Sequence, residues 1–175
     1  TLFRSWIARI LRTTKAQSRI RSEVPIGRFD YTETHSGALE IDLVEHNGGN
    51  SSGHYAYTPN AVDIVSGFNR CKAVLGRGQA GIFKALKTII AEFPFEVWAL
   101  HSDNGVESLN DHLVRYIRKH GLTFHRGQPY RRNDQPYVEQ KNRQFGGELV
   151  GYGRYDTSED VAWLNEVYTI FDPYA

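Results

Sequence analysis

The stretch ALEIDLVEH at residues 38–46 constrains the fold more than any other part of the chain. Leu39, Ile41 and Leu43 alternate with Glu40 and Asp42, which is the two-residue period of a β-strand with one apolar face. Asp is disfavoured inside strands, and a buried carboxylate costs several kcal/mol unless a cation, hydrogen bonds or solvent compensate its charge. The stretch therefore predicts a strand carrying an acid that needs a partner.

Alternating and helical patterns continue after this strand. Residues 54–76 fit two more strands joined by a turn at residues 66–67, and Pro59 suits the edge or end of a strand better than its centre. Periodicity and apolar runs then predict helices at 78–93 and 106–121 and strands at 95–100 and 122–125.

The resulting order, β-β-β-α-β-α-β-α, predicts an α/β fold. Its mixed five-stranded sheet has three antiparallel strands and then two parallel strands, flanked by helices. The last helix begins with Asn133 or Asp134 as N-cap and Pro136 in its first turn. Glycines at residues 146–153 predict that this helix breaks or frays there, rather than that they form a phosphate loop, because no strand precedes them.

Composition indicates one sizeable globular domain. The 175 residues are 40% hydrophobic and 23% charged, with a net charge of +1. The lone Cys71, the lack of a signal peptide and the lack of a membrane-length apolar stretch predict a cytoplasmic protein. The absence of Met, even at position 1, predicts a piece of a longer protein.

Basic residues are concentrated in two segments. Residues 1–30 and 118–143 each carry seven Lys or Arg. Such segments fit either a surface that binds a polyanion or ordinary surface charge.

Three acids are spaced so that the fold can bring them together. Asp42 lies in the first strand, Asp103 follows the strand at 95–100, and Glu139 lies in the first turns of the last helix. Converging carboxylates need positive charge between them, and two Mg²⁺ or Mn²⁺ ions about 4 Å apart suit phosphoryl transfer. The alternative is that Asp103 only begins an Asp-Asn-Gly turn and that Glu139 is an ordinary surface acid.

Four stretches together carry a family resemblance: EIDLV, HSDNGVE, PYRRNDQPYVEQKN and LVGYGRYD. They resemble the integrase-type catalytic core of bacterial insertion-sequence transposases, in the superfamily that includes retroviral integrases. The resemblance covers residues 37–156, with 35 residues between Asp103 and Glu139, a gap typical of the superfamily. It implies an RNase H-like fold whose triad of Asp42, Asp103 and Glu139 is catalytic and binds two Mg²⁺ (or Mn²⁺) ions.

The resemblance also implies a reaction and partners. Water first hydrolyses a phosphodiester at an element end, and the freed 3′-hydroxyl then attacks target DNA, both by in-line displacement. The expected partner is DNA, bound by a homodimer or higher multimer in the bacterial cytoplasm at the nucleoid, with no membrane involved. The alternatives are an inactive remnant that only binds DNA or multimerises, and a plain RNase H-like nuclease.

Weaker roles fall on neighbouring residues. Asn104 and Gly105 are expected to shape the turn around Asp103. The residues expected to contact the DNA backbone are Arg126, Arg131, Arg132, Lys141 and Arg143. The expected organisation is a basic helix or linker at 1–36, the catalytic core at 37–156 and an acidic segment at 157–175.

Overall fold

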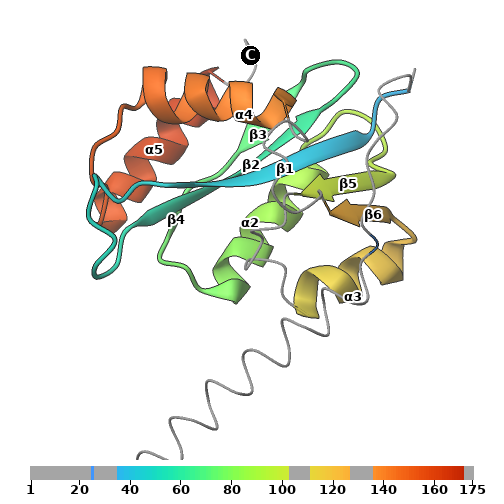
Figure 1. The fold of residues 1–175 in the computed structure, drawn as a ribbon, viewed down its shortest axis with the longest axis horizontal. Coiled ribbons are helices and arrows are strands. Elements are labelled where there is room, and N and C mark those ends of the chain that lie inside the picture. Colours follow the sequence, from blue (N-terminus) through green and yellow to red (C-terminus); the bar gives the residue numbers. More distant parts are fainter. Residues whose placement is uncertain (1–24, 26–34, 103–110, 127–135, 172–175) are drawn as a thin grey trace, which may run out of the picture.

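A six-stranded sheet with helices on both sides forms the body of the protein (Figure 1). The computed structural model describes residues 25, 35–102, 111–126 and 136–171. The strands are β1 (Ala38–Glu45), β2 (Ala56–Asp63), β3 (Asn69–Cys71), β4 (Val74–Leu75), β5 (Ala99–Ser102) and β6 (Thr123–Arg126). The helices are α2 (Gln79–Ala91), α3 (Asp111–His120), α4 (Pro136–Asn142), the π-helix η1 (Arg143–Leu149) and α5 (Ser158–Phe171).

The strand order confirms the predicted mixed sheet. Five strands follow the path β3-β2-β1-β5-β6. The pairs β1–β2 and β2–β3 are antiparallel, whereas β1–β5 and β5–β6 are parallel. The strand expected at 95–100 is found at Ala99–Ser102, as β5, and it is the neighbour of the first strand, as the convergence of the predicted acids requires. A short extra strand, β4, pairs with β2 beside β3.

Pro59 lies inside β2 and is buried, so its expected place at a strand edge or end is wrong. The segment that runs from β3 through β4 lies beside β2 and forms the third strand of the sheet, interrupted in its middle. The Pro59 carbonyl accepts a hydrogen bond from the Lys72 N–H of this segment at 3.2 Å, so the backbone of Pro59 faces the third strand. Proline has no N–H to donate on that side. The third strand is interrupted at Lys72 and Ala73, between β3 and β4. Pro59 is thus tolerated because the break in the neighbouring strand falls opposite it.

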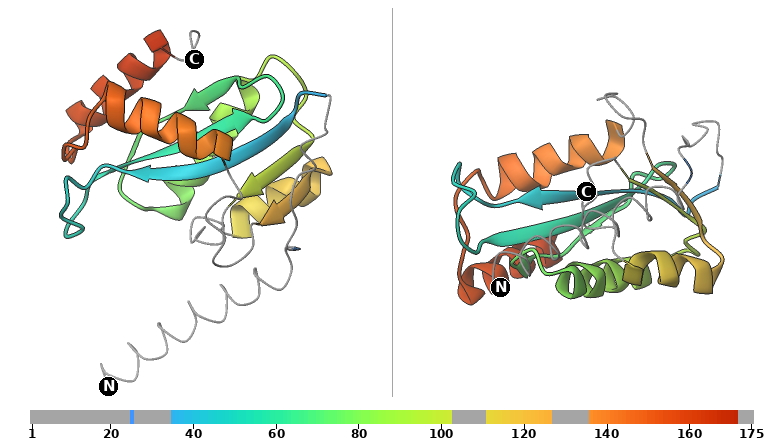
Figure 2. Two further views of the ribbon diagram at one scale, coloured as in Figure 1. Left: turned by 45° about the horizontal axis from the view of Figure 1, so that its top comes forward. Right: turned by 60° about the horizontal axis from the view of Figure 1, so that its bottom comes forward.

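The two faces of the sheet differ in polarity. One face carries Leu39, Ile41 and Leu100, which pack with apolar side chains of α2 and α3 into the main core. Figure 2 shows α2 and α3 on this side and α4 on the opposite side of the sheet. The face under α4 carries Glu40 and Asp42, since alternate residues of a strand point to opposite faces. The strand alternation in the sequence thus separates the core face from a polar face.

The helix ends inside the glycine-rich stretch at residues 146–153, as predicted, although it first continues through Gly146 and Gly147. The chain continues from α4 into η1, which ends only at Leu149. A Cβ on Gly146 would lie 3.1 Å from Val44 Cγ1 of β1, so glycine lets the helix approach the strand closely. Gly151 then adopts a positive φ of 76° just after the helix, and its N–H donates to the Gly147 carbonyl at 3.1 Å. This is the usual role of glycine after a helix C-terminus.

Helix α5 completes the interrupted edge of the sheet. Its buried residues Leu164 and Tyr168 pack with Ala56 and Cys71 of β2 and β3 in a second apolar cluster. The Asn165 side chain accepts from the Ala73 N–H at 2.9 Å and donates to the Ala73 carbonyl at 3.0 Å. An amide side chain therefore replaces a strand partner where the third strand breaks.

In the part of the chain that the structure describes, no helix is long and apolar enough to cross a membrane.

Candidate functional site

The polar face of the sheet is the candidate site. Glu40 and Asp42 point to this face from β1, opposite Val62 and Asn60 of β2. Glu40 is also in register with His101 of β5. Glu40, Asn60 and His101 are each about 1% exposed. Charged and amide side chains are seldom so deeply buried unless they are bonded, so this face is built around polar contacts.

Glu40 is bonded to the start of α4. Its Oε2 accepts hydrogen bonds from the N–H groups of Tyr137 and Val138, both at 3.0 Å. The first N–H groups of a helix have no acceptor within the helix. A carboxylate at this end is also favoured by the helix dipole. The buried charge of Glu40 is therefore compensated by the helix that carries Glu139.

Asp42 is bonded to the end of the same helix. The Asn142 side-chain NH₂ donates to Asp42 Oδ2 at 2.6 Å. The Asn60 NH₂ donates in turn to Asn142 Oδ1 at 2.8 Å. An ionised carboxylate can only accept, so it fixes the direction of both amides. This chain of bonds connects β1, β2 and α4 at the half-buried Asp42.

The direction of these bonds leaves one oxygen beside Asp42 without a donor. Asn60 Oδ1 is buried and accepts no hydrogen bond from any residue that the structure describes. A buried oxygen in this state calls for a donor or a cation. The Asp42 carboxylate and this amide oxygen are the hard donors that Mg²⁺ and Mn²⁺ prefer, so the residues present fit such an ion.

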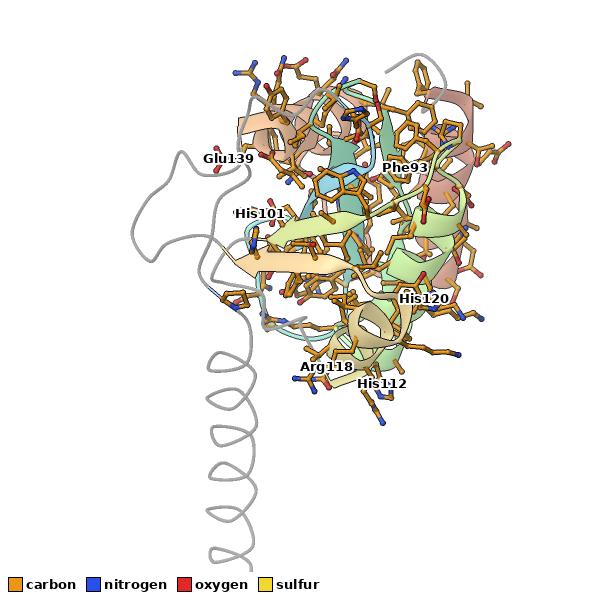
Figure 3. All side chains as sticks on the ribbon, turned by 90° about the vertical axis from the view of Figure 1, so that its right-hand side faces the viewer. Phe93, His101, His112, Arg118, His120 and Glu139 are labelled. Carbon is orange, nitrogen blue, oxygen red and sulfur yellow. The ribbon has the colours of Figure 1, made fainter. Side chains whose placement is uncertain are left out.

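Glu139 is exposed on α4, three residues before Asn142. Residues three apart are neighbours on a helix, so Glu139 lies on the side of α4 that reaches Asp42. Figure 3 shows Glu139 and His101 at the same end of the molecule, where β5 and β6 finish. Ser102, the last residue of β5, pairs with Ile41. Asp103 follows it in the sequence and lies outside the described residues.

The remaining predicted residues are only partly described. Lys141 is half-buried on α4. Arg143 is exposed and its Nε lies 3.6 Å from Glu148 Oε1, an ion pair worth at most about 1 kcal/mol at the surface. Arg126 ends β6, and its side chain is not described. Asn104, Gly105, Arg131 and Arg132 lie outside the described residues.

Three residues of this site were not singled out from the sequence: Glu40, Asn60 and Asn142. The alternation in β1 did place Glu40 on the face of Asp42, and Asn142 stands one helical turn after Glu139. Those spacings were the available signal.

Within the described ranges, no group of three or more His, Cys, Asp or Glu side chains could hold a metal ion. Asp103 lies outside these ranges.

Comparison with solved structures identifies the fold. The catalytic core domain of BIV integrase superposes with a TM-score of 0.57 at 19% identity, over 79% of this chain and 82% of that one. The HTLV-2 integrase catalytic core domain in complex with magnesium gives 0.52 at 14% identity, over 66% and 72%. A chain of the simian T-cell lymphotropic virus intasome in complex with PP2A regulatory subunit B56 gamma gives a TM-score of 0.58 at 14% identity, over 84% of this chain and 52% of that one.

The protein therefore has the RNase H-like fold of an integrase catalytic core. In sequence it is 35% identical over 158 residues to a protein of Sinorhizobium fredii (strain NBRC 101917 / NGR234), uncharacterized protein y4rM. That match covers 90% of this chain but 45% of the relative, so the chain spans a little under half of the relative's length. No protein-family model matches the chain.

Proposed function

We propose that this chain is the catalytic domain of a metal-dependent DNA transposase or integrase of the bacterial insertion-sequence type. The observation that carries the proposal is the attachment of Asp42 to α4 through Asn142, on an integrase-core fold. This attachment holds the Asp42 strand against the helix that bears Glu139. The sheet order gives further support, since Asp103 follows the strand next to β1.

In this proposal Asp42, Asp103 and Glu139 hold one or two Mg²⁺ or Mn²⁺ ions through their carboxylates. The bound metal supplies Lewis-acid stabilisation of the attacking and leaving oxygens. Asn142 and Asn60 keep the Asp42 carboxylate in place, and Asn104 with Gly105 shapes the turn at Asp103. Water and then a 3′-hydroxyl displace an oxygen at phosphorus in line, so no covalent intermediate with the protein is required.

DNA is the proposed partner, as both element end and target. Arg126, Arg131, Arg132, Lys141 and Arg143 are the proposed contacts to its backbone, since Lys and Arg neutralise phosphates without reading sequence. Joining two element ends calls for a dimer or higher multimer on DNA, acting in the cytoplasm at the nucleoid. A lone monomer on paired DNA ends, measured by light scattering, would contradict the multimer.

The experiment is DNA cleavage and strand joining by the purified chain in Mg²⁺ and Mn²⁺. A branched strand-transfer product and a nicked duplex serve as substrates, because neither requires recognition of an element end. Asp42→Asn and Asp103→Asn are expected to lower the rate by more than about 100-fold, since each removes a metal-binding carboxylate charge. Glu45→Gln is the matched control, because Glu45 stands in the same strand but bonds the Tyr55 hydroxyl.

Each outcome separates the alternatives. The proposed transposase activity is supported if the chain both cleaves and joins DNA, and if both activities are lost in the two Asp variants and kept in Glu45→Gln. Hydrolysis without joining would favour a plain nuclease. A folded wild-type protein that binds DNA but does neither reaction would favour a binding or multimerisation module.

A further inference from the structure

Glu40 is an acidic side chain buried in the middle of the sheet, where a carboxyl group carries a desolvation cost. It is 1% exposed and is one of the largest fully buried side chains. A buried carboxyl group is costly unless its oxygens are hydrogen-bonded, and removing one partner of a buried polar contact leaves the other unsatisfied. The contacts that Glu40 makes therefore decide what this position contributes.

What the carboxylate does provide is a fixed attachment for α4. Glu40 Oε2 accepts from the N–H groups of two consecutive residues, Tyr137 and Val138. The next residue in the chain is Glu139. Two bonds to one oxygen restrict both the position of the helix start and its rotation about its own axis. The backbone that carries Glu139 is held directly by β1.

The second attachment lies on the other side of Glu139. Asn142, three residues later, donates to Asp42 on the same strand and the same face as Glu40. Glu40 and Asp42 thus hold α4 at two points that bracket Glu139. Because both points belong to β1, a movement of the helix relative to Asp42 has to break one of these bonds.

We propose that Glu40 is a positioning residue, which sets the distance and orientation of Glu139 relative to Asp42 by holding the first turn of α4 on β1. This inference rests on the proposed function, since it assigns Glu40 to the placement of that reaction's acids. Glu40 itself touches neither metal nor DNA in this role. Its expected signature is a weaker metal site in a protein that stays folded.

The test compares Glu40→Ala and Glu40→Gln with the control Glu45→Ala. Glu40→Ala removes both bonds, whereas Glu40→Gln keeps a carbonyl oxygen that can accept from both N–H groups. The first readout is hydrogen exchange at the amides of residues 137 and 138, which needs no activity. The second is Mn²⁺ affinity by binding titration, and the third is the Mg²⁺ concentration that gives half-maximal cleavage.

Glu40→Ala is expected to lower protection of both amides by at least about tenfold, as expected for the loss of a hydrogen bond of ordinary strength. Its Mn²⁺ affinity is expected to fall about 10- to 100-fold, with a matching rise in the Mg²⁺ requirement. Glu40→Gln is expected to restore most of the protection and much of the affinity. Glu45→Ala is expected to leave all three readouts at the wild-type level.

The outcomes distinguish this inference from the function on which it rests. If Glu40→Ala exposes the two amides yet binds Mn²⁺ as tightly as the wild type, Glu40 is only a helix cap and the inference is overturned. Unchanged protection in Glu40→Ala would overturn it as well. A folded wild type that neither binds Mn²⁺ nor cleaves DNA would overturn the proposed function first, and with it the catalytic purpose of the attachment. If Glu40→Ala does not fold, Glu40→Met, which keeps most of the volume but has no oxygen to accept from the two N–H groups, takes its place with the same expected and overturning results.

Discussion

At the scale of single residues, Asn142 connects the candidate catalytic acid of β1 to the helix. Its side chain donates to Asp42 at 2.6 Å and accepts from Asn60 at 2.8 Å. Asn142→Ala removes both bonds and with them this support of the Asp42 carboxylate. We expect the cleavage rate at saturating Mg²⁺ to fall about 10- to 100-fold, the usual cost of losing a residue that orients a metal-binding group.

The control for Asn142 is Gln140→Ala on the exposed side of α4. Both variants place Ala, a good helix former, in the same helix, and Asn142→Ala gains slightly more propensity than Gln140→Ala because Asn is the poorer helix former. A slower reaction in Asn142→Ala therefore does not arise from helix propensity. Equal rates in the two variants would show that the bond to Asp42 has no role in the reaction.

Sequence reasoning at this scale identified acids but not their supports. The position of Asp42 in a strand and of Glu139 in the first turns of a helix followed from local periodicity. Glu40 shares the alternation of Asp42, but alternation does not reveal whether a face is open to water or covered by a helix. The helix that covers it begins almost a hundred residues later in the chain, and no local pattern encodes that contact.

At the scale of elements, Gly146 decides how closely η1 lies on β1. A Cβ at this position would be 3.1 Å from Val44 Cγ1 and 3.6 Å from Val44 Cγ2. Because Val44 has to give way by a few tenths of an ångström, overpacking offsets the helix-propensity gain of Ala, and Gly146→Ala is expected to be about 1–2 kcal/mol less stable than an unobstructed Gly→Ala variant. Gly81→Ala in α2 is the matched control, because open space surrounds Gly81. That variant is expected to stabilise by up to about 1 kcal/mol through helix propensity.

Chemical denaturation measures both glycine variants. The double variant Gly146→Ala/Val44→Ala is expected to recover part of the loss, because the two positions are in contact and their effects are coupled. If Gly146→Ala stabilised the protein as much as Gly81→Ala, the close approach of η1 to β1 would not be the reason for the glycine.

The elements that sequence reasoning misjudged or described incompletely are those completed by distant partners. Glycines read locally indicate a weak helix, whereas Gly146 is needed for the contact with Val44. Pro59 read locally indicates a strand end, but Asn165 of α5 pairs with the backbone of Ala73 in the break opposite it. Strand and helix periods come from neighbouring residues, and these exceptions come from residues far along the chain.

At the scale of the whole molecule, His46 joins the end of β1 to β2 and α5. Its Nε2 is 2.8 Å from Thr58 Oγ1, which lies 3.2 Å from the Tyr168 hydroxyl. The imidazole is 3% exposed and packs edge-on against the Tyr155 ring. Burial lowers the pKa of His46 from 6.5 to about 4, because the charged form would lose its hydration.

This lowered pKa predicts how folding stability depends on pH. Between about pH 6.5 and pH 4 the unfolded chain binds a proton at His46 and the folded protein does not. The contribution of neutral His46 is therefore complete above pH 6.5, is lost as pH falls from 6.5 towards 4, and changes no further below 4. The shift corresponds to at most about 3 kcal/mol.

Denaturation curves measured across this pH window test the prediction. We expect the stability of the wild type to fall towards that of His46→Gln as the pH falls. A comparison with His54→Gln, which alters an exposed histidine, isolates the effect of burial. A constant difference between wild type and His46→Gln from pH 7 to pH 4 would contradict the assignment, because a residue that does not titrate differently in the two states cannot change the slope.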